Sequence, residues 1–168
     1  MALATLRSPA SDFETHLRRC LPGSNDLGLI ILTGHLLLEE EIDGLIFENL
    51  ANPAALQQAG LSFPQRLCLA RALAIPDDLD LLLDIAQRLT DLRDHVASPA
   101  EHPQLERHLE EFLCLVEDPE ASLDDHERGT MSARLQRAIV FLCAELSGWR
   151  DVYAARNSLI PTQSRAAG

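Results

Sequence analysis

Apolar residues recur at intervals of three and four positions along most of the chain, which is the pattern of amphipathic helices. Proline, glycine and serine residues separate these stretches, and no β-hairpin signal appears between them. We therefore expect about six helices. The first opens at Ser8 or Ser11 and stops at Pro22, and the others cover about 24–50, 62–74, 77–97, 98–117 and 130–153.

Composition predicts the same fold class. Of the 168 residues, 46% are apolar but only 4% are aromatic, so aliphatic side chains must fill the core. Leucine favours helices, whereas strands are enriched in β-branched and aromatic residues. The length fits one domain. We predict a single all-α, mostly antiparallel bundle of five to six helices over residues 1–157, followed by a flexible tail at 158–168.

The charged residues exclude several functions. The chain carries 26 acidic side chains against 14 basic ones, all of them arginine, and its formal charge is −12. Without lysine it has no amine for Schiff-base chemistry, pyridoxal phosphate or a phosphate-binding P-loop. Nucleic acids and anionic membranes are poor partners for such an acidic protein. No apolar run reaches the roughly 20 residues that span a bilayer, and the first residues do not resemble a signal peptide, so we expect a cytoplasmic protein.

The cysteines and histidines do not predict a metal site. The four cysteines lie far apart within apolar helical patterns and are expected to be buried free thiols: Cys20, Cys68, Cys114 and Cys143. The chain contains no Glu-x-x-His pair and no tight ligand spacing. His16 and His35 are expected to be packed, hydrogen-bonded histidines, and His35 has the spacing of a salt bridge with Glu39. We expect no metal and no cofactor.

The helix expected at 24–50 is apolar on nearly every side in its first half, which indicates a central element of the bundle. Three glutamates at 39–41 then interrupt it. Glu39 fits a solvated position, whereas Glu40 lies on a mostly apolar strip and needs a partner. Arg93 interrupts the apolar stripe of the helix at 77–97 in the same way. We predict an Arg93–Glu40 ion pair across the core; the alternative is an Arg93 whose stem packs while its guanidinium reaches water.

Four stretches of the chain resemble the HEPN-like helical-bundle superfamily, including its mannitol-operon repressor (MltR-like) branch. They are DLGL at 26–29, HLLLEEE at 35–41, LSFPQRLCLA at 61–70 and LTDLRD at 89–94. Members of the superfamily typically have a buried leucine helix that ends in acids, an L-x-F-x-x-R/K-L-x-L-A segment and a helix that ends in L-R-N-x-x-A-H. The resemblance covers a little under half of the chain and implies an all-α bundle.

The last of these motifs departs from the family pattern. Arg93 aligns with the family arginine, Asp94 stands where asparagine is usual, and Ser98 takes the place of the closing histidine. In catalytic members, that arginine and histidine act together in metal-independent RNA cleavage. Ser98 instead suits the N-cap of the next helix. His95 lies about 200° around the helix from Arg93, and His102 lies in the next segment, so either would act from a displaced position.

These observations leave two functional hypotheses. The preferred one is a non-catalytic HEPN-like module that regulates by binding a protein partner and forms a homodimer, with Glu40, Arg93 and Asp94 as a structural or vestigial site. The alternative is a HEPN-type ribonuclease that uses Arg93 with His102 or His95.

Trp149 and Tyr153 lie on the broad apolar stripe of the last helix, near its end. Core packing accounts for both residues. A protein–protein contact at this surface is the second interpretation.

Overall fold

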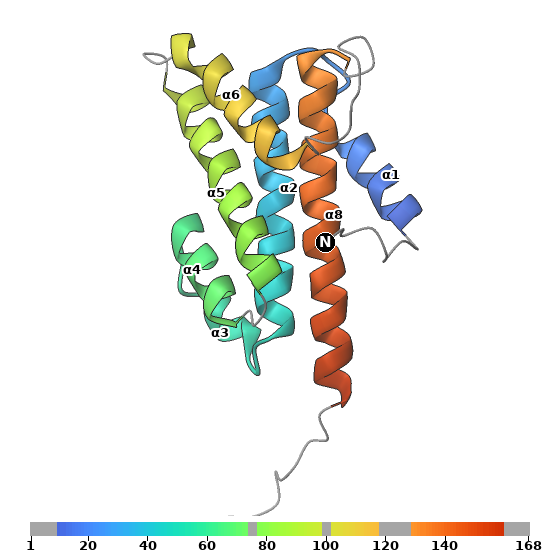
Figure 1. The fold of residues 1–168 in the computed structure, drawn as a ribbon. Coiled ribbons are helices and arrows are strands. Elements are labelled where there is room, and N and C mark those ends of the chain that lie inside the picture. Colours follow the sequence, from blue (N-terminus) through green and yellow to red (C-terminus); the bar gives the residue numbers. More distant parts are fainter. Residues whose placement is uncertain (1–9, 74–76, 99–101, 118–128, 160–168) are drawn as a thin grey trace, which may run out of the picture.

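The computed structural model describes residues 10–73, 77–98, 102–117 and 129–159, and seven helices make up most of this part. They are α1 (Ala10–Cys20), α2 (Leu27–Glu48), α3 (Pro53–Gln57), α4 (Phe63–Leu73), α5 (Asp77–Ala97), α6 (His102–Val116) and α8 (Met131–Leu159). No strand occurs within these ranges, so the predicted all-α class is confirmed. Figure 1 shows α2, α5 and α8 side by side, with α3 and α4 near one end and α6 at the other.

Side-chain caps set several of the helix ends. The helix α2 starts at Leu27, three residues after the predicted start. The Asp26 carboxylate caps it by accepting a hydrogen bond from the Leu29 amide at 3.0 Å. Before α4, the predicted capping box forms, because Gln65 Oε1 accepts from the Ser62 amide at 2.9 Å. The second helix ends at Glu48, near its predicted end, but the short helix α3 was not predicted; Pro53 lies in its first turn, where the fixed φ of proline is already helical.

The most extensive helix contact joins α2 and α8. An ideal Cβ on Gly34 would lie 2.5 Å from Ile139 Cδ1, so a larger residue at this position would force Ile139 to shift. Nearly three turns further along α2, Gly44 leaves room for the side chain of Arg150. Arg150 Nη1 donates to Glu41 Oε2 at 3.3 Å, and Glu41 is buried. This interface is therefore apolar and close-packed, with one ion pair near its end.

The four cysteines are free thiols and His16 is hydrogen-bonded, as predicted, but the predicted burial is wrong for three of the cysteines and for His16. Cys143 is buried, and burial raises the pKa of its thiol to about 12. Cys20, Cys68 and Cys114 are exposed, and His16 is an exposed neighbour of Cys20, with Nε2 3.6 Å from Sγ. These residues lie at the edges of their apolar stripes, where periodicity alone does not separate core from surface.

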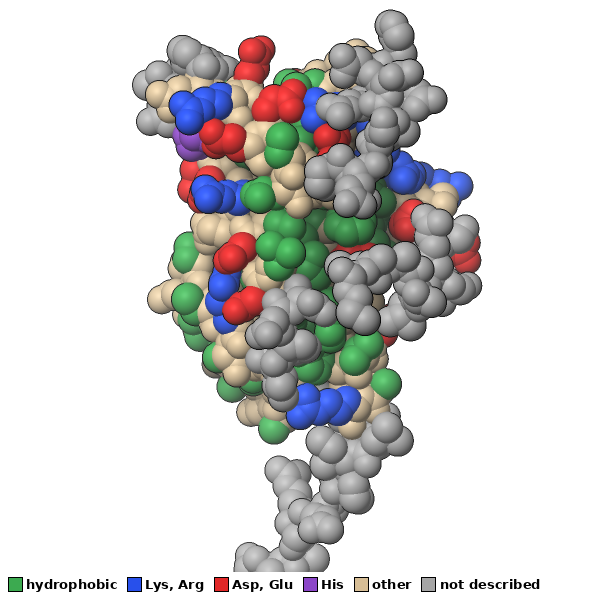
Figure 2. All heavy atoms as spheres, viewed as in Figure 1, with side chains coloured by type: hydrophobic (Ala, Val, Ile, Leu, Met, Phe, Trp, Pro, Cys, Tyr) green, Lys and Arg blue, Asp and Glu red, His purple; other side chains and the backbone are tan. Residues whose placement is uncertain are grey.

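Arginines on the surface are paired with acids from neighbouring helices. Arg134 of α8 donates to Glu110 and Glu117 at 2.8–3.1 Å, and Arg71 of α4 contacts Asp80 on α5. In Figure 2, basic side chains accordingly lie beside acidic ones over α4, α5 and α6. Among the helices described, none is long and apolar enough to cross a bilayer.

Candidate functional site

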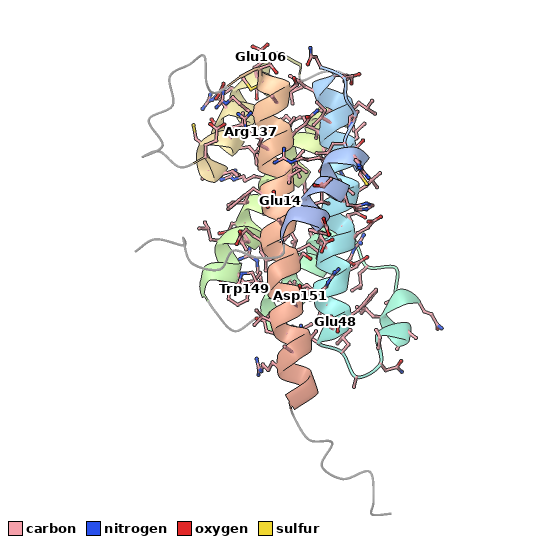
Figure 3. All side chains as sticks on the ribbon, turned by 90° about the vertical axis from the view of Figure 1, so that its right-hand side faces the viewer. Glu14, Glu48, Glu106, Arg137, Trp149 and Asp151 are labelled. Carbon is pink, nitrogen blue, oxygen red and sulfur yellow. The ribbon has the colours of Figure 1, made fainter. Side chains whose placement is uncertain are left out.

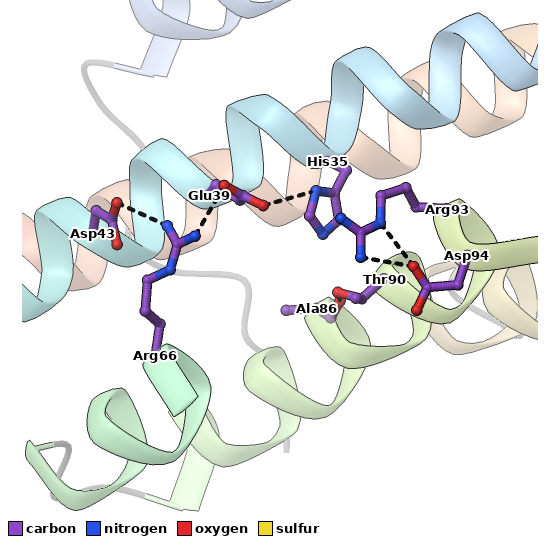
Figure 4. Close-up of polar contacts among 8 residues, drawn as sticks. All are labelled: His35, Glu39, Asp43, Arg66, Ala86, Thr90, Arg93 and Asp94. Carbon is purple, nitrogen blue, oxygen red and sulfur yellow. Dashed lines mark hydrogen bonds and ion pairs between the residues drawn. The ribbon is translucent and has the colours of Figure 1, made fainter. Parts of the chain in front are cut away.

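Six polar side chains form a continuous line between α2 and the pair α4 and α5 (Figure 4); we call them the polar array: Asp43, Arg66, Glu39, His35, Arg93 and Asp94. Arg66 of α4 donates from Nη1 to Asp43 Oδ2 at 2.9 Å and from Nη2 to Glu39 Oε2 at 3.2 Å. One turn earlier on α2, His35 Nδ1 lies 3.3 Å from Glu39 Oε1. The array therefore links α4 to the centre of α2.

His35 is the most deeply buried member of the array. It is 1% exposed, and its ring packs on Phe63 with the centroids 4.8 Å apart. Burial lowers the pKa of His35, and the positive charge of Arg93 lowers it further. Because a carboxylate only accepts hydrogen bonds, the neutral ring carries its proton on Nδ1, toward Glu39. Its Nε2 is a buried acceptor without a hydrogen-bond partner. The prediction of a packed, hydrogen-bonded His35 is confirmed.

Arg93 approaches His35 from α5. Figure 4 shows its guanidinium and the imidazole of His35 turned toward each other. Arg93 donates from Nε and Nη2 to Asp94 Oδ1 at 3.0 and 2.7 Å. Its side chain remains 35% exposed. The arginine that the sequence singled out thus lies next to an imidazole, but one from α2 rather than from its own segment.

The predicted Arg93–Glu40 pair is wrong, because Glu40 is exposed and Arg93 holds Asp94. Glu40 and Leu36, one turn before it, face solvent, whereas Leu37 and Phe47 on the two sides of the same strip pack against the core. The buried glutamate of the triplet is Glu41, and burial raises its pKa even though Arg150 opposes the shift. Glu39, expected to be solvated, is half-buried within the array.

The two other candidate histidines belong to the junction of α5 and α6. His95 Nδ1 lies 2.6 Å from the carbonyl oxygen of Asp91, and its ring packs against that of His108 with the centroids 4.5 Å apart. His95 therefore faces α6, whereas Arg93 faces α2. His102 begins α6, and its side chain lies outside the described residues. The helix expected to start at Ser98 begins at His102.

The end of α8 contains the two aromatic residues of the predicted interaction surface. Tyr153 is part of the core, so the surface interpretation is wrong for it and core packing is confirmed. Trp149, labelled in Figure 3, is half-buried against the same core, with its ring centroid 6.3 Å from that of Tyr153. The longer helix, which ends at Leu159, places Tyr153 within the bundle rather than at its edge.

A pocket of about 310 Å³ opens where the array meets the connection between α3 and α4. It is lined by Asp43, Phe47, Leu56, Gly60, Leu61 and Arg66. Within the described ranges, no three His, Cys, Asp or Glu side chains cluster as metal ligands would. Because Asp43 and Arg66 are polar and Phe47, Leu56 and Leu61 are apolar, the lining of the pocket offers both hydrogen-bonding and apolar groups to a ligand.

Sequence reasoning did not predict the contacts of Arg66 with Asp43 and Glu39, nor that His35 lies beside Arg93. The available signals were an imidazole inside an apolar run with a carboxylate one turn later, and an arginine in the segment LSFPQRLCLA. Neither signal says which helices meet.

The comparisons with known proteins identify no relative: no family model, no curated protein and no solved structure matches the chain. The HEPN-like resemblance thus stays a prediction that rests on the quoted motifs and on the position of Arg93.

Proposed function

We propose that this chain is a non-catalytic, HEPN-like interaction or regulatory module that works by binding a protein partner. The observation that carries the proposal is the geometry of the polar array, in which Asp94 binds the guanidinium of Arg93 and His35 is withdrawn from solvent. A general base must come within about 3 Å of the proton that it removes. A buried imidazole packed on Phe63 does not meet an RNA hydroxyl without rearrangement.

Charge supports the same proposal. Arginines that would otherwise attract phosphates are engaged by acids of this chain, as Arg66, Arg134 and Arg150 illustrate. The remaining surface is acidic, with a formal charge of −12 for the whole chain. An acidic protein in which these arginines are engaged is better suited to a protein partner than to RNA.

The experiment is purification of the tagged full chain from its native host, followed by mass spectrometry and light scattering. We expect a protein present in stoichiometric amount, and a mass of two copies for the chain alone, as the proposed homodimer requires. The absence of any stoichiometric protein, together with RNA cleavage by the purified chain, would contradict the proposal.

A second candidate function is metal-independent RNA cleavage by Arg93 and His35. The observation in its favour is that the guanidinium and the imidazole point toward each other (Figure 4). In such a reaction the imidazole accepts the proton of the attacking 2′-hydroxyl, the 2′-oxygen bonds to phosphorus as the bond to the 5′-oxygen breaks, and solvent water protonates the leaving 5′-oxygen. The guanidinium stabilises negative charge on the phosphate.

An assay on single-stranded RNA in the presence of a chelator separates the two functions. The preferred proposal predicts no cleavage by the wild type. Cleavage that is lost in Arg93→Gln but retained in His16→Gln would instead support the ribonuclease, and His95→Gln would test whether His95 takes part. Circular dichroism of each variant checks that the fold is unchanged.

A further inference from the structure

The side of α2 that faces away from the core carries large apolar side chains in contact with solvent. Leu29, Leu32 and Leu36 are 47%, 40% and 61% exposed. Their spacing of three and four residues places them on one face of the helix. Its other faces pack against α4, α5 and α8, and Arg66 of α4 also reaches Asp43, further along the same face as these leucines. Solvent-exposed leucines in a row are unfavourable unless a partner covers them.

The same face of α2 leads into the pocket. Leu36, Glu40, Asp43 and Phe47 follow one another at intervals of three or four residues. At 100° per residue, all four therefore lie within about 40° of Leu36 around the helix axis. Asp43 and Phe47 line the pocket. We call the face from Leu29 to Phe47 the outer face of α2; at 1.5 Å per residue it is about 27 Å long.

Carboxylates lie along the second half of the outer face. Glu40 is exposed, and the Asp43 side chain is 34% exposed although Arg66 binds one of its oxygens. Arg66 is shared between Asp43 and Glu39, so one positive charge faces two negative ones. The outer face is thus apolar in its first half and negatively charged in its second half.

We propose that the outer face of α2 binds an amphipathic helix of a partner protein that is apolar along one stripe and basic at one end. Its apolar side chains cover the three exposed leucines, and its basic residues meet Glu40 and Asp43. An apolar side chain beside those basic residues enters the pocket next to Phe47. Helices that dock in this way present anchors at i, i+3 or i+4 and i+7. The inference rests on the proposed function and specifies its surface and the chemistry of the partner.

A second copy of the chain fits the outer face less well. In a parallel pair of α2 helices, each carboxylate would face its own equivalent, and like charges repel. An antiparallel pair centred on Leu36 would place Glu40 against Leu32. An unpaired carboxylate buried against leucine loses its hydration without compensation. The charge pattern therefore favours a basic partner.

The proposal is tested with the immobilised full chain and a displayed library of helical peptides. The residues on one face of each peptide are randomised, and the peptides that bind are selected. Wild-type protein should enrich peptides with an apolar stripe and with lysine or arginine at one end. Leu36→Asp should weaken the binding of an enriched peptide by roughly tenfold or more, because it places a charge in an apolar contact. Glu40→Gln should weaken it by about two- to fivefold, and added salt should reduce that difference.

Leu81→Asp is the matched control, because Leu81 is 57% exposed on α5, away from the outer face. It should leave the affinity unchanged. Since both leucines are exposed, both variants should keep the wild-type circular dichroism.

Each alternative outcome has a defined meaning. Enrichment of acidic peptides, failure to enrich any peptide, or equal losses in Leu36→Asp and Leu81→Asp would overturn the proposal. Self-association of the wild type that Leu36→Asp abolishes would assign the outer face to a second copy and equally overturn it. If a partner purified from the host bound Leu36→Asp as tightly as the wild type, this surface would be refuted while the proposed function remained.

Discussion

The central helix α2 has two buried sides that are stabilised in different ways. Toward α8 it is apolar and close-packed, and Gly34 lies against Ile139. Toward α4 and α5 it presents the polar array, with His35 and Glu39 held by groups from other helices. The stability of the α2–α8 contact depends on how well the side chains fill the space between the helices. The stability of the contact with α4 and α5 depends on each charged side chain being paired with an opposite charge. Changes in side-chain size should therefore act mainly on one side, and changes in charge or pH on the other.

Truncation of the apolar side should have the largest effect. Ile139→Ala removes a fully buried side chain at the α2–α8 contact and should lower the free energy of unfolding by about 2–5 kcal/mol. Urea denaturation measures the loss. Phe141→Ala, at a solvent-exposed position of the same helix, should change stability by no more than about 0.5 kcal/mol. If both variants lost a similar amount of free energy of unfolding, Ile139 would not be packed between α8 and α2.

Overpacking of the same contact should have the next largest effect. Gly34→Ala brings a methyl group to 2.5 Å from Ile139 Cδ1 and should cost about 1–3 kcal/mol, less the roughly 1 kcal/mol by which alanine favours a helix. Ile139→Val in the same chain should recover part of the loss in a double-mutant cycle. Gly148→Ala, on α8 with open space around its Cβ, should be stabilising. A stabilising Gly34→Ala would contradict the close approach.

Removal of one charge should disturb the polar side by a smaller amount. Arg66→Met leaves Glu39 and Asp43 without their shared donor and should cost about 1–2 kcal/mol, between the values for exposed and buried pairs. Adding Glu39→Gln and Asp43→Asn to this variant should restore much of the loss. The exposed pair of Arg107 and Glu111 supplies the control, since Arg107→Met should change stability by at most about 0.5 kcal/mol.

Low pH should lower the stability of the polar side of α2, because His35 becomes protonated. Its pKa in the folded chain lies below the ordinary value of 6.5, through burial and then through Arg93. The unfolded chain therefore binds the proton first as the pH falls, so the contribution of His35 is complete above about pH 6.5 and is lost as the pH drops through the folded pKa. Because His35 binds a single proton, it can change the free energy of unfolding by at most about 1.4 kcal/mol per pH unit.

An NMR titration of the His35 ring tests this assignment. Arg93→Gln should raise the pKa of His35, and Glu39→Gln should lower it, because the charges of these two neighbours act in opposite directions. An imidazole that titrates at or above its ordinary value in the wild type would contradict a buried, neutral His35.

Much of the fold followed from the sequence because helix formation is governed by local rules. The period of the apolar residues predicted the long helices α2, α5 and α8, and the Ser62–Gln65 capping box predicted the start of α4. The boundary errors occurred where two local signals compete, as at Pro53, which can follow one helix or begin another.

The candidate site was predicted only in part. Arg93 stood out because it interrupts an apolar stripe, and it does lie beside an imidazole. The partner expected for it, Glu40, was chosen because it also interrupts an apolar strip, and the histidines considered for it, His95 and His102, were chosen because they lie near it along the chain. The imidazole that it meets belongs to His35, which lies 58 positions away in the sequence. No local pattern connects two such residues.

By itself, the sequence determined that this chain forms helices and roughly where they begin and end, because hydrogen bonding and capping act between near neighbours. Only the tertiary structure decided the fate of the three consecutive glutamates, which face Arg66, solvent and Arg150 in turn. A helical period of 100° per residue sends adjacent side chains in different directions, but only the packing of the other helices decides what each direction meets.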